Sequence, residues 1–201
     1  MGCRFMTSFH GIVDQAQLRP GEWVAVHGCG GIGLSAVQIA AALGARVIAV
    51  DVAEDKLAFA KELGAEAIVN ATKDDVAGAI ATLTGGGAHV SIDALGIATT
   101  CLNSILCLRK RGRHLQIGLT TQAEKGMVAL PIDVMVFKEL RIIASFGMQA
   151  PHFAAMLAMV EAKKLDPGKL VSRRVGLGDV TSVVESMGSY GTSGVTVITQ
   201  Y

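Results

Sequence analysis

The sequence predicts a doubly wound α/β fold, in which helices cover both faces of a six-stranded parallel sheet. Short, continuous apolar segments alternate with amphipathic helical stretches, and uninterrupted apolar segments are typical of strands buried on both faces. Glycines stand at many of the joints, and the chain has 24 of them in 201 residues. Strands that alternate with helices in this way form parallel sheets.

Each element follows from its apolar period and its end signals. The expected strands are residues 23–26, 47–50, 67–69, 90–94, 114–117 and 140–146. The expected helices are 5–17, 32–43, a segment from Glu54 to Gly64, 75–83, and one capped by Thr99 or Thr100 that runs through Leu108. The basic residues 109–113 are interpreted as the positive end of that last helix. The last fifty residues predict helices at 152–162 and 180–187 and a strand at 195–199.

Composition narrows the class of protein. Apolar residues make up 51% and charged residues 17%, which excludes global disorder, and a net charge of +1 gives no nucleic-acid footprint. No segment is long and apolar enough to span a membrane, and no signal peptide is visible. Four cysteines without a Cys-x-x-Cys pair argue against a disulfide framework. We therefore expect a soluble, cytoplasmic protein.

A glycine-rich turn links the first predicted strand to the next helix. It reads Gly28-Cys29-Gly30-Gly31-Ile32-Gly33. Backbone N–H groups at a helix N-terminus bind a pyrophosphate, because the helix dipole is positive there. The first glycine allows the tight turn, the second lets the diphosphate approach, and the third lets helix and strand pack closely. The turn predicts a dinucleotide site in a Rossmann fold.

Asp51, at the end of the second strand, makes the signal more specific. A carboxylate at that position can accept hydrogen bonds from both ribose hydroxyls of the adenosine. A 2′-phosphate there would meet a like charge, so Asp51 favours NAD over NADP.

With these residues in place, the chain resembles the coenzyme-binding half of the zinc-type, medium-chain alcohol dehydrogenases. Residues 2–7 look like the family's G-C-x-x-x-T helix start, and residues 20–33 are similar to its strand and phosphate turn. Residues 63–66 and 112–118 match later landmarks. The resemblance implies a linking helix at 1–22, an NAD-binding Rossmann domain at 23–146, and a C-terminal appendage at 147–201 that would pack back on a catalytic domain.

The resemblance also implies roles for individual residues. Cys3 falls on one ligand of the catalytic zinc, Thr7 lies beside the nicotinamide, and Lys56 lies near the adenosine ribose. Five residues match the strand ends along the cofactor: Ala94, Leu95, Ile117, Gly118 and Leu119. Ser145 and Phe146 match the segment beside the carboxamide, and the strand 140–146 is the edge through which family members pair into homodimers.

Departures from the family pattern limit what we expect of this chain. The other zinc ligands and the proton-relay hydroxyl belong to a catalytic domain that we do not find, so no catalytic set is complete and we expect a domain fragment that is inactive alone. Val195 stands where many members have an Arg that reaches the pyrophosphate. In a complete enzyme, zinc acts as a Lewis acid on a small alcohol or aldehyde.

The five histidines offer no metal site by their spacing, since no two stand at H-x-x-x-H positions on one helix. We interpret His27, beside the turn, as structural, and Asp93 as a cleft residue, a cap or a solvated acid.

Two other functions remain open. An S-adenosylmethionine methyltransferase also uses a glycine turn and an acid, and a non-catalytic nucleotide-binding module could use the apolar edge strand for assembly.

Overall fold

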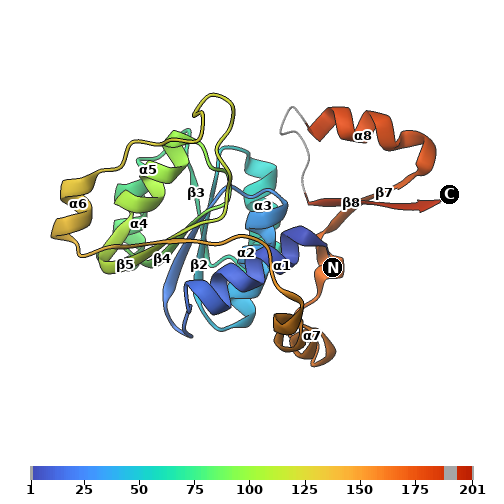
Figure 1. Ribbon diagram of the computed structural model, residues 1–201, viewed down its shortest axis with the longest axis horizontal. Helices are drawn as coiled ribbons and strands as arrows, with labels where there is room; N and C mark the ends of the chain where they lie inside the picture. The colour runs from blue at the N-terminus through green and yellow to red at the C-terminus, as the bar shows by residue number, and fades with distance from the viewer. Residues whose placement is uncertain (1, 188–193, 201) are drawn as a thin grey trace.

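The computed structural model describes residues 2–187 and 194–200. Its main feature is a six-stranded sheet in the order β3-β2-β1-β4-β5-β6, in which every neighbouring pair is parallel. The strands are β1 (Trp23–His27), β2 (Arg46–Asp51), β3 (Ala67–Asn70), β4 (Ala88–Asp93), β5 (Leu108–Gln116) and β6 (Arg141–Ala144). The predicted doubly wound Rossmann fold is confirmed (Figure 1).

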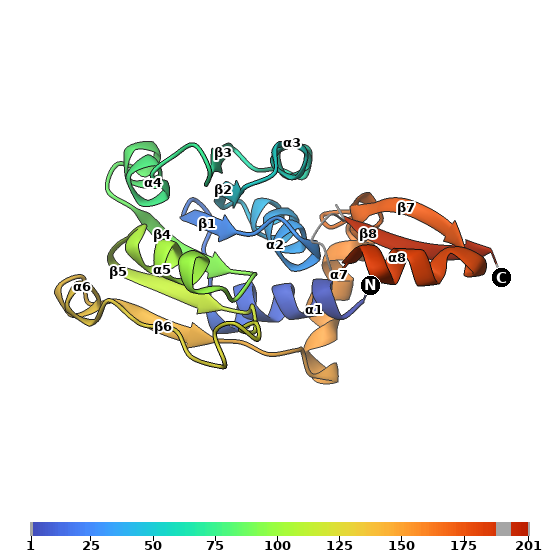
Figure 2. The same cartoon turned by 90° about the horizontal axis from the view of Figure 1, so that it is seen from above.

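Helices connect the strands and lie on both faces of the sheet, as Figure 2 shows from above. They are α1 (Cys3–His10), which continues as the π-helical turn η1 (Gly11–Gln15), α2 (Gly31–Ala42), α3 (Glu54–Glu62), α4 (Val76–Thr84), α5 (Ala98–Leu106) and α6 (Ile132–Phe137). The first strand has apolar contacts on both faces. Val24 and Val26 join the cluster under α1, α2 and α3, whereas Trp23 and Ala25 join a second cluster with α4.

The C-terminal segment lies beside the main sheet (Figure 1). It contains η2 (Ala150–His152), α7 (Phe153–Glu161), η3 (Pro167–Leu170), β7 (Val171–Gly176), η4 (Leu177–Asp179), α8 (Val180–Met187) and β8 (Val195–Gln200). Strands β7 and β8 pair as a separate parallel sheet. The side chain of Met156 on α7 is buried in the cluster that contains Phe5 and Phe9, so this segment packs against α1.

Two local predictions were wrong, and two elements were missed. The basic residues 109–113 lie within strand β5, not at a helix end, because α5 stops at Leu106 and the chain turns directly into the strand. Helix α5 is capped by Ile97, and the hydroxyl of Thr100 donates to Asp93 instead. The sequence also gave no indication of α6 or β7.

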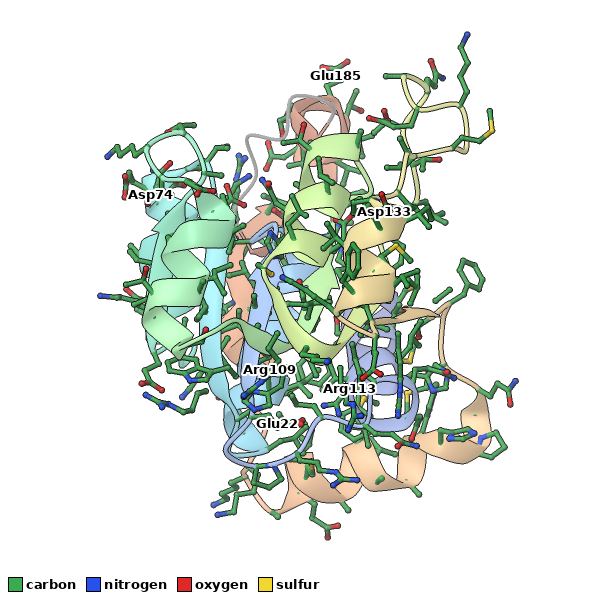
Figure 3. The ribbon with its side chains drawn as sticks, turned by 90° about the vertical axis from the view of Figure 1, so that its left-hand side faces the viewer. Glu22, Asp74, Arg109, Arg113, Asp133 and Glu185 are labelled. Carbon is green, nitrogen blue, oxygen red and sulfur yellow. The ribbon has the colours of Figure 1, made fainter. Side chains whose placement is uncertain are left out.

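An ion pair explains one part of the misassigned basic run. The guanidinium of Arg113 pairs with the carboxylate of Glu22, and both side chains are mostly buried (Figure 3). Glu22 immediately precedes β1, so the pair joins β5 to the start of the central strand. Among the described residues, no helix has both the length and the apolar character needed to cross a membrane.

Candidate nucleotide-binding site

The glycine turn after β1 is packed very closely at two positions, against a side chain at Gly28 and against backbone at Gly33. Gly28 has φ +91°, and a Cβ there would lie 1.8 Å from Cδ1 of Leu95. A Cβ on Gly33 would lie only 1.7 Å from the carbonyl oxygen of Gly28. Because a side chain at either position would collide with its neighbour, both glycines are required for α2 to start directly on the turn.

Gly30 differs from the other two, since it borders open space. It is the N-cap of α2, and a Cβ built on it would meet nothing within 4 Å. The amides of Gly31, Ile32 and Gly33 open the helix, where N–H groups have no acceptor within the helix. The hydroxyl of Ser8 donates to the Ile32 carbonyl at 2.9 Å and ties this end of α2 to α1. The glycine turn and the first amides of α2, which we call the cradle, therefore have the space and the donors that a diphosphate needs.

Asp51 is hydrogen-bonded to the turn itself. Its Oδ2 accepts from the N–H of Cys29 at 2.6 Å, and its Oδ1 accepts from Val52 and Ala53 at 2.8 and 3.0 Å. A carboxylate offers about four acceptor positions, so by count one remains on this half-buried group. Burial and then the charge of Asp51 raise the pKa of the Cys29 thiol, and the ammonium of Lys56 opposes them.

The predicted residues after β4 and β5 lie against one another. Gly96 has φ +88°, and a Cβ on Gly118 would lie 2.4 Å from the Gly96 nitrogen and from the Leu95 carbonyl carbon. Ala94 and Leu95 are half-buried. Since Leu95 also covers Gly28, these two loops and the glycine turn lie together at one edge of the sheet. At this edge β1 and β4 are neighbours, and the order of successive strands reverses between them.

Asp93 organises that edge, and the interpretation of it as a solvated acid was wrong. Its side chain is fully buried. One carboxylate oxygen accepts from the amides of Leu95 and Gly96 and from the hydroxyl of Thr100, and the other accepts from the Gln116 amide at 3.0 Å. A buried carboxylate with this many donors is a structural group, because it fixes both loops at once.

His27 lies at the end of β1, within the same buried network. Burial lowers its pKa to about 4, and the opposing charge of Asp93 only partly offsets this. Its Nε2 lies 3.6 Å from the sulfur of Cys107. The imidazole is therefore neutral near pH 7 and buried, in agreement with a structural role.

Cys3 and Thr7 are brought together on one face of α1. The Cys3 sulfur lies 3.7 Å from the Thr7 hydroxyl oxygen, with Cys3 exposed and Thr7 buried. Among the described residues, the only cluster of three or more His, Cys, Asp or Glu side chains close enough to share a metal ion lies elsewhere. The residues present around Cys3 thus do not form a zinc site, and we derive no chemical step through zinc.

Arg4 was missed at the sequence level, yet it lies directly on the phosphate turn. A Cβ on Gly31 would lie 2.4 Å from Cδ of Arg4 and 2.8 Å from its Nη1. Among the described residues this guanidinium forms no ion pair. A cation at a helix N-terminus is unfavourable unless an anion joins it, because the dipole there is already positive.

A cavity of about 430 Å³ lies beside Arg4. It is bordered by the start of α1, by Ser35 of α2, and by residues of η3, β7 and β8 that include Val195. Neither Asp51 nor any residue of the glycine turn lines this cavity, which reaches the turn only through the neighbouring Arg4 and Ser35.

The segment after β6 holds the remaining predicted residues. The hydroxyl oxygen of Ser145 is buried and has no hydrogen-bond partner among the described residues. Phe146 next to it is 86% exposed, and Leu119 is 74% exposed. The Ser145 hydroxyl faces the interior near Gly11, so it contributes no exposed polar group to this part of the surface.

Residues 31–162 match the model of the family described as zinc-binding dehydrogenase. The chain is 36% identical over 127 residues to an alcohol dehydrogenase of Geobacillus stearothermophilus, which covers 63% of this chain and 36% of that protein. It is 34% identical over 143 residues to an alcohol dehydrogenase of Rhizobium meliloti strain 1021, which covers 71% of this chain and 40% of the relative.

Solved structures agree with the sequence comparison. Alcohol dehydrogenase TADH from Thermus sp. ATN1 superimposes with a TM-score of 0.89 at 25% identity, over all of this chain and 57% of that one. A zinc-binding dehydrogenase of Sinorhizobium meliloti 1021 bound to NADP gives 0.84 at 28% identity, over 97% and 57%. The chain belongs to the zinc-binding dehydrogenase family. It spans about two fifths or less of the curated relatives it matches.

The buried His27 predicts a pH dependence of stability. Its pKa is about 4 in the folded state and about 6.5 when unfolded, so only the unfolded state gains a proton between these values. The free energy of unfolding should fall by about 3 kcal/mol as the pH drops from 6.5 to 4. Urea titrations at several pH values in this range should show that the free energy of unfolding depends less steeply on pH in His27→Gln than in the parent. An equal dependence on pH would contradict the low pKa of His27.

Proposed function

We propose that this chain is the NAD(H)-binding part of a zinc-dependent alcohol dehydrogenase and does not complete a catalytic site by itself. The observation that carries the proposal is the open cradle at Gly30, with Asp51 hydrogen-bonded to the same turn. The family membership and the alcohol dehydrogenase relatives support the same class of reaction. They give no support to a methyltransferase.

The residues of the chain would hold the cofactor in three places. The amides of Gly31 to Gly33 would bind the diphosphate, and Asp51 would accept from the adenosine ribose through its remaining acceptor position. Ser145 and Phe146 would lie beside the carboxamide, as the family resemblance implies. The nicotinamide, when bound, exchanges a hydride with the carbon of a small alcohol or aldehyde.

Asp51 supports NAD over NADP. A 2′-phosphate beside this carboxylate would meet a like charge, and three protein amides already hold the carboxylate in place at the glycine turn. Lys56, whose charge acts on Cys29 from the same region, would lie near the adenosine ribose.

The open space at Gly30 gives a direct test of the cradle. In Gly30→Ala the new methyl group meets no protein atom, so the melting temperature should stay within a few degrees of the parent. NADH affinity, measured by calorimetry, should fall at least about tenfold, because the methyl group takes the space of the diphosphate. Gly178→Ala also adds a methyl group in open space, far from the turn, and should bind NADH like the parent. Unchanged affinity in Gly30→Ala would exclude this seat for the diphosphate.

Arg4 is proposed to supply the pyrophosphate contact that Val195 cannot make. Arg4→Gln should weaken NADH binding by about 10- to 100-fold, since a charge-assisted hydrogen bond contributes about 1.5–3 kcal/mol. The affinity should also depend less on salt, whereas the binding of adenosine, which has no phosphate, should not change. Arg19→Gln removes an exposed arginine near the start of β1 and serves as the control. If the two variants bind NADH equally, Arg4 has no such role.

The edge strand β6 is proposed to pair two copies of the chain into a homodimer. The strand has a free edge in the sheet, and apolar side chains are exposed on it and near it, namely Ile132, Val136, Phe137, Ile142 and Phe146. A non-catalytic assembly module would use the same edge. If Gly30→Ala lost NADH binding but stayed dimeric, NADH binding and dimer formation would be shown to be separate properties.

Sedimentation at high concentration should therefore give a dimer for the parent chain. Ile142→Lys, which places a charge on β6, should give a monomer with an unchanged melting temperature at low concentration. Val184→Lys places the same charge on an even more exposed valine of α8 and should remain dimeric. A strict monomer in the parent would overturn the proposed interface.

A further inference from the structure

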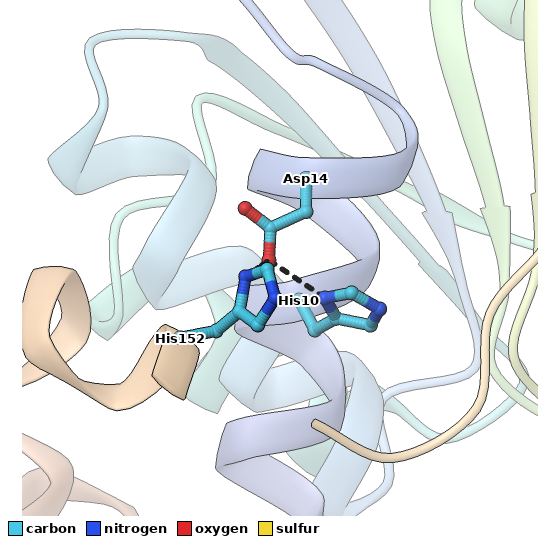
Figure 4. Close-up of side chains that lie close together, drawn as sticks. All are labelled: His10, Asp14 and His152. Carbon is cyan, nitrogen blue, oxygen red and sulfur yellow. Dashed lines mark hydrogen bonds and ion pairs between the residues drawn. The ribbon is translucent and has the colours of Figure 1, made fainter. Parts of the chain in front are cut away.

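Two histidines and an aspartate outside the nucleotide site lie together where the C-terminal segment meets the first helix (Figure 4). His10 ends α1, Asp14 lies in the π-helical turn η1, and His152 ends η2. The Asp14 Oδ2 lies 2.6 Å from Nδ1 of His10 and 3.3 Å from Nδ1 of His152. One ligand atom from each residue lies within 4.8 Å of the other two.

The hydrogen bonds around His10 indicate which tautomer its neutral ring would adopt. The side-chain amide nitrogen of Gln15 lies 3.1 Å from Nε2 of His10 and can only donate to it, so that ring nitrogen is the acceptor. The proton of a neutral His10 therefore sits on Nδ1, where it is donated to Asp14. A metal ion could take the place of this proton on Nδ1. The proton would then sit on Nε2, and the imidazole would stay neutral.

We propose that His10, Asp14 and His152 bind a divalent transition-metal ion of the zinc type. Two imidazoles and one carboxylate suit zinc and its neighbours in the first transition row, which accept nitrogen and oxygen ligands together. Ligand atoms around a tetrahedral zinc stand about 3.3 Å apart, given bonds of about 2.0–2.1 Å. The observed separations reach that spacing with side-chain shifts of an ångström or so, and water fills the fourth position.

Gln15 would act as an outer partner of this site. With the metal on Nδ1 of His10, its Nε2 carries the proton and needs an acceptor. Rotation of the Gln15 amide presents its carbonyl oxygen in place of its nitrogen, because the two ends of an amide have nearly the same shape. Metal-bound histidines usually donate their second N–H to such a carbonyl or carboxylate.

This site is separate from the position of Cys3. Cys3 and His10 stand at opposite ends of α1, which separates their backbones by about 10 Å at 1.5 Å per residue. The consequence of binding is also different. The ion would join η1 to the beginning of α7, a helix already anchored by the buried Met156, and so would fix the C-terminal segment on the nucleotide domain.

The test uses the full chain with Cys3→Ser, which removes the exposed thiol while the other three cysteines are buried. Titration with Co²⁺ should give one equivalent of visible absorption typical of tetrahedral coordination. Zinc at a hundredfold excess over its Kd should raise the melting temperature by about 5 °C or more.

Variants at the cluster should remove both signals. His152→Ala and Asp14→Asn are each expected to lower Co²⁺ affinity more than tenfold, and Gln15→Ala about tenfold, as the loss of an outer partner does. His152 is exposed, so its removal should leave the fold intact. Asp133→Asn, an exposed aspartate on α6, is the matched control and should bind Co²⁺ like the parent.

The proposal is overturned if the parent shows no saturable Co²⁺ signal, or if His152→Ala and Asp14→Asn bind Co²⁺ as tightly as Asp133→Asn. NADH affinity, measured in the same proteins, does not depend on this cluster. A loss of NADH binding would therefore concern the nucleotide site and not the proposed metal site.

Discussion

The close approach of α2 to the end of β1 is the constraint on which the rest of the structure depends. A helix can start within a few residues of a buried strand only if the backbone carries no Cβ where the two meet, as at Gly28 and Gly33. This contact points the first amides of α2 at the edge of the sheet. The same contact lets Leu95 cover Gly28, so the loop after β4 is set by the turn after β1.

Polar groups complete the edge from inside the protein. Asp93 binds the loops after β4 and β5 through four donors, and Asp51 binds the glycine turn through Cys29. The two aspartates therefore differ in kind. Asp93 is fully buried and accepts four hydrogen bonds from the protein, whereas Asp51 is half-buried and accepts three. The proposed nucleotide site would thus use an edge that these hydrogen bonds already fix, whereas among the described residues Cys3 belongs to no cluster that could share a metal ion.

The succession of strands and helices along the chain, and the position of the glycine turn between the first strand and its helix, could be predicted from sequence because each depends on local patterns. The first part of the strand at 108–116 could not, since a basic run looks the same at a helix end and on an exposed strand. Long-range partners such as Glu22 for Arg113 and Glu139 for Arg111 distinguish the two. The proximity of Arg4 to Gly31 and of His152 to Asp14 had no sequence signal either. Each pair joins segments whose approach depends on how helices pack, not on spacing along the chain.

The most direct measurement is a crystal structure of the chain soaked in NADH. The account predicts the diphosphate on the amides of residues 31–33, the adenosine ribose at Asp51, and the nicotinamide amide beside Ser145 and Phe146. An empty turn at saturating NADH, or a cofactor bound elsewhere on the protein, would contradict it.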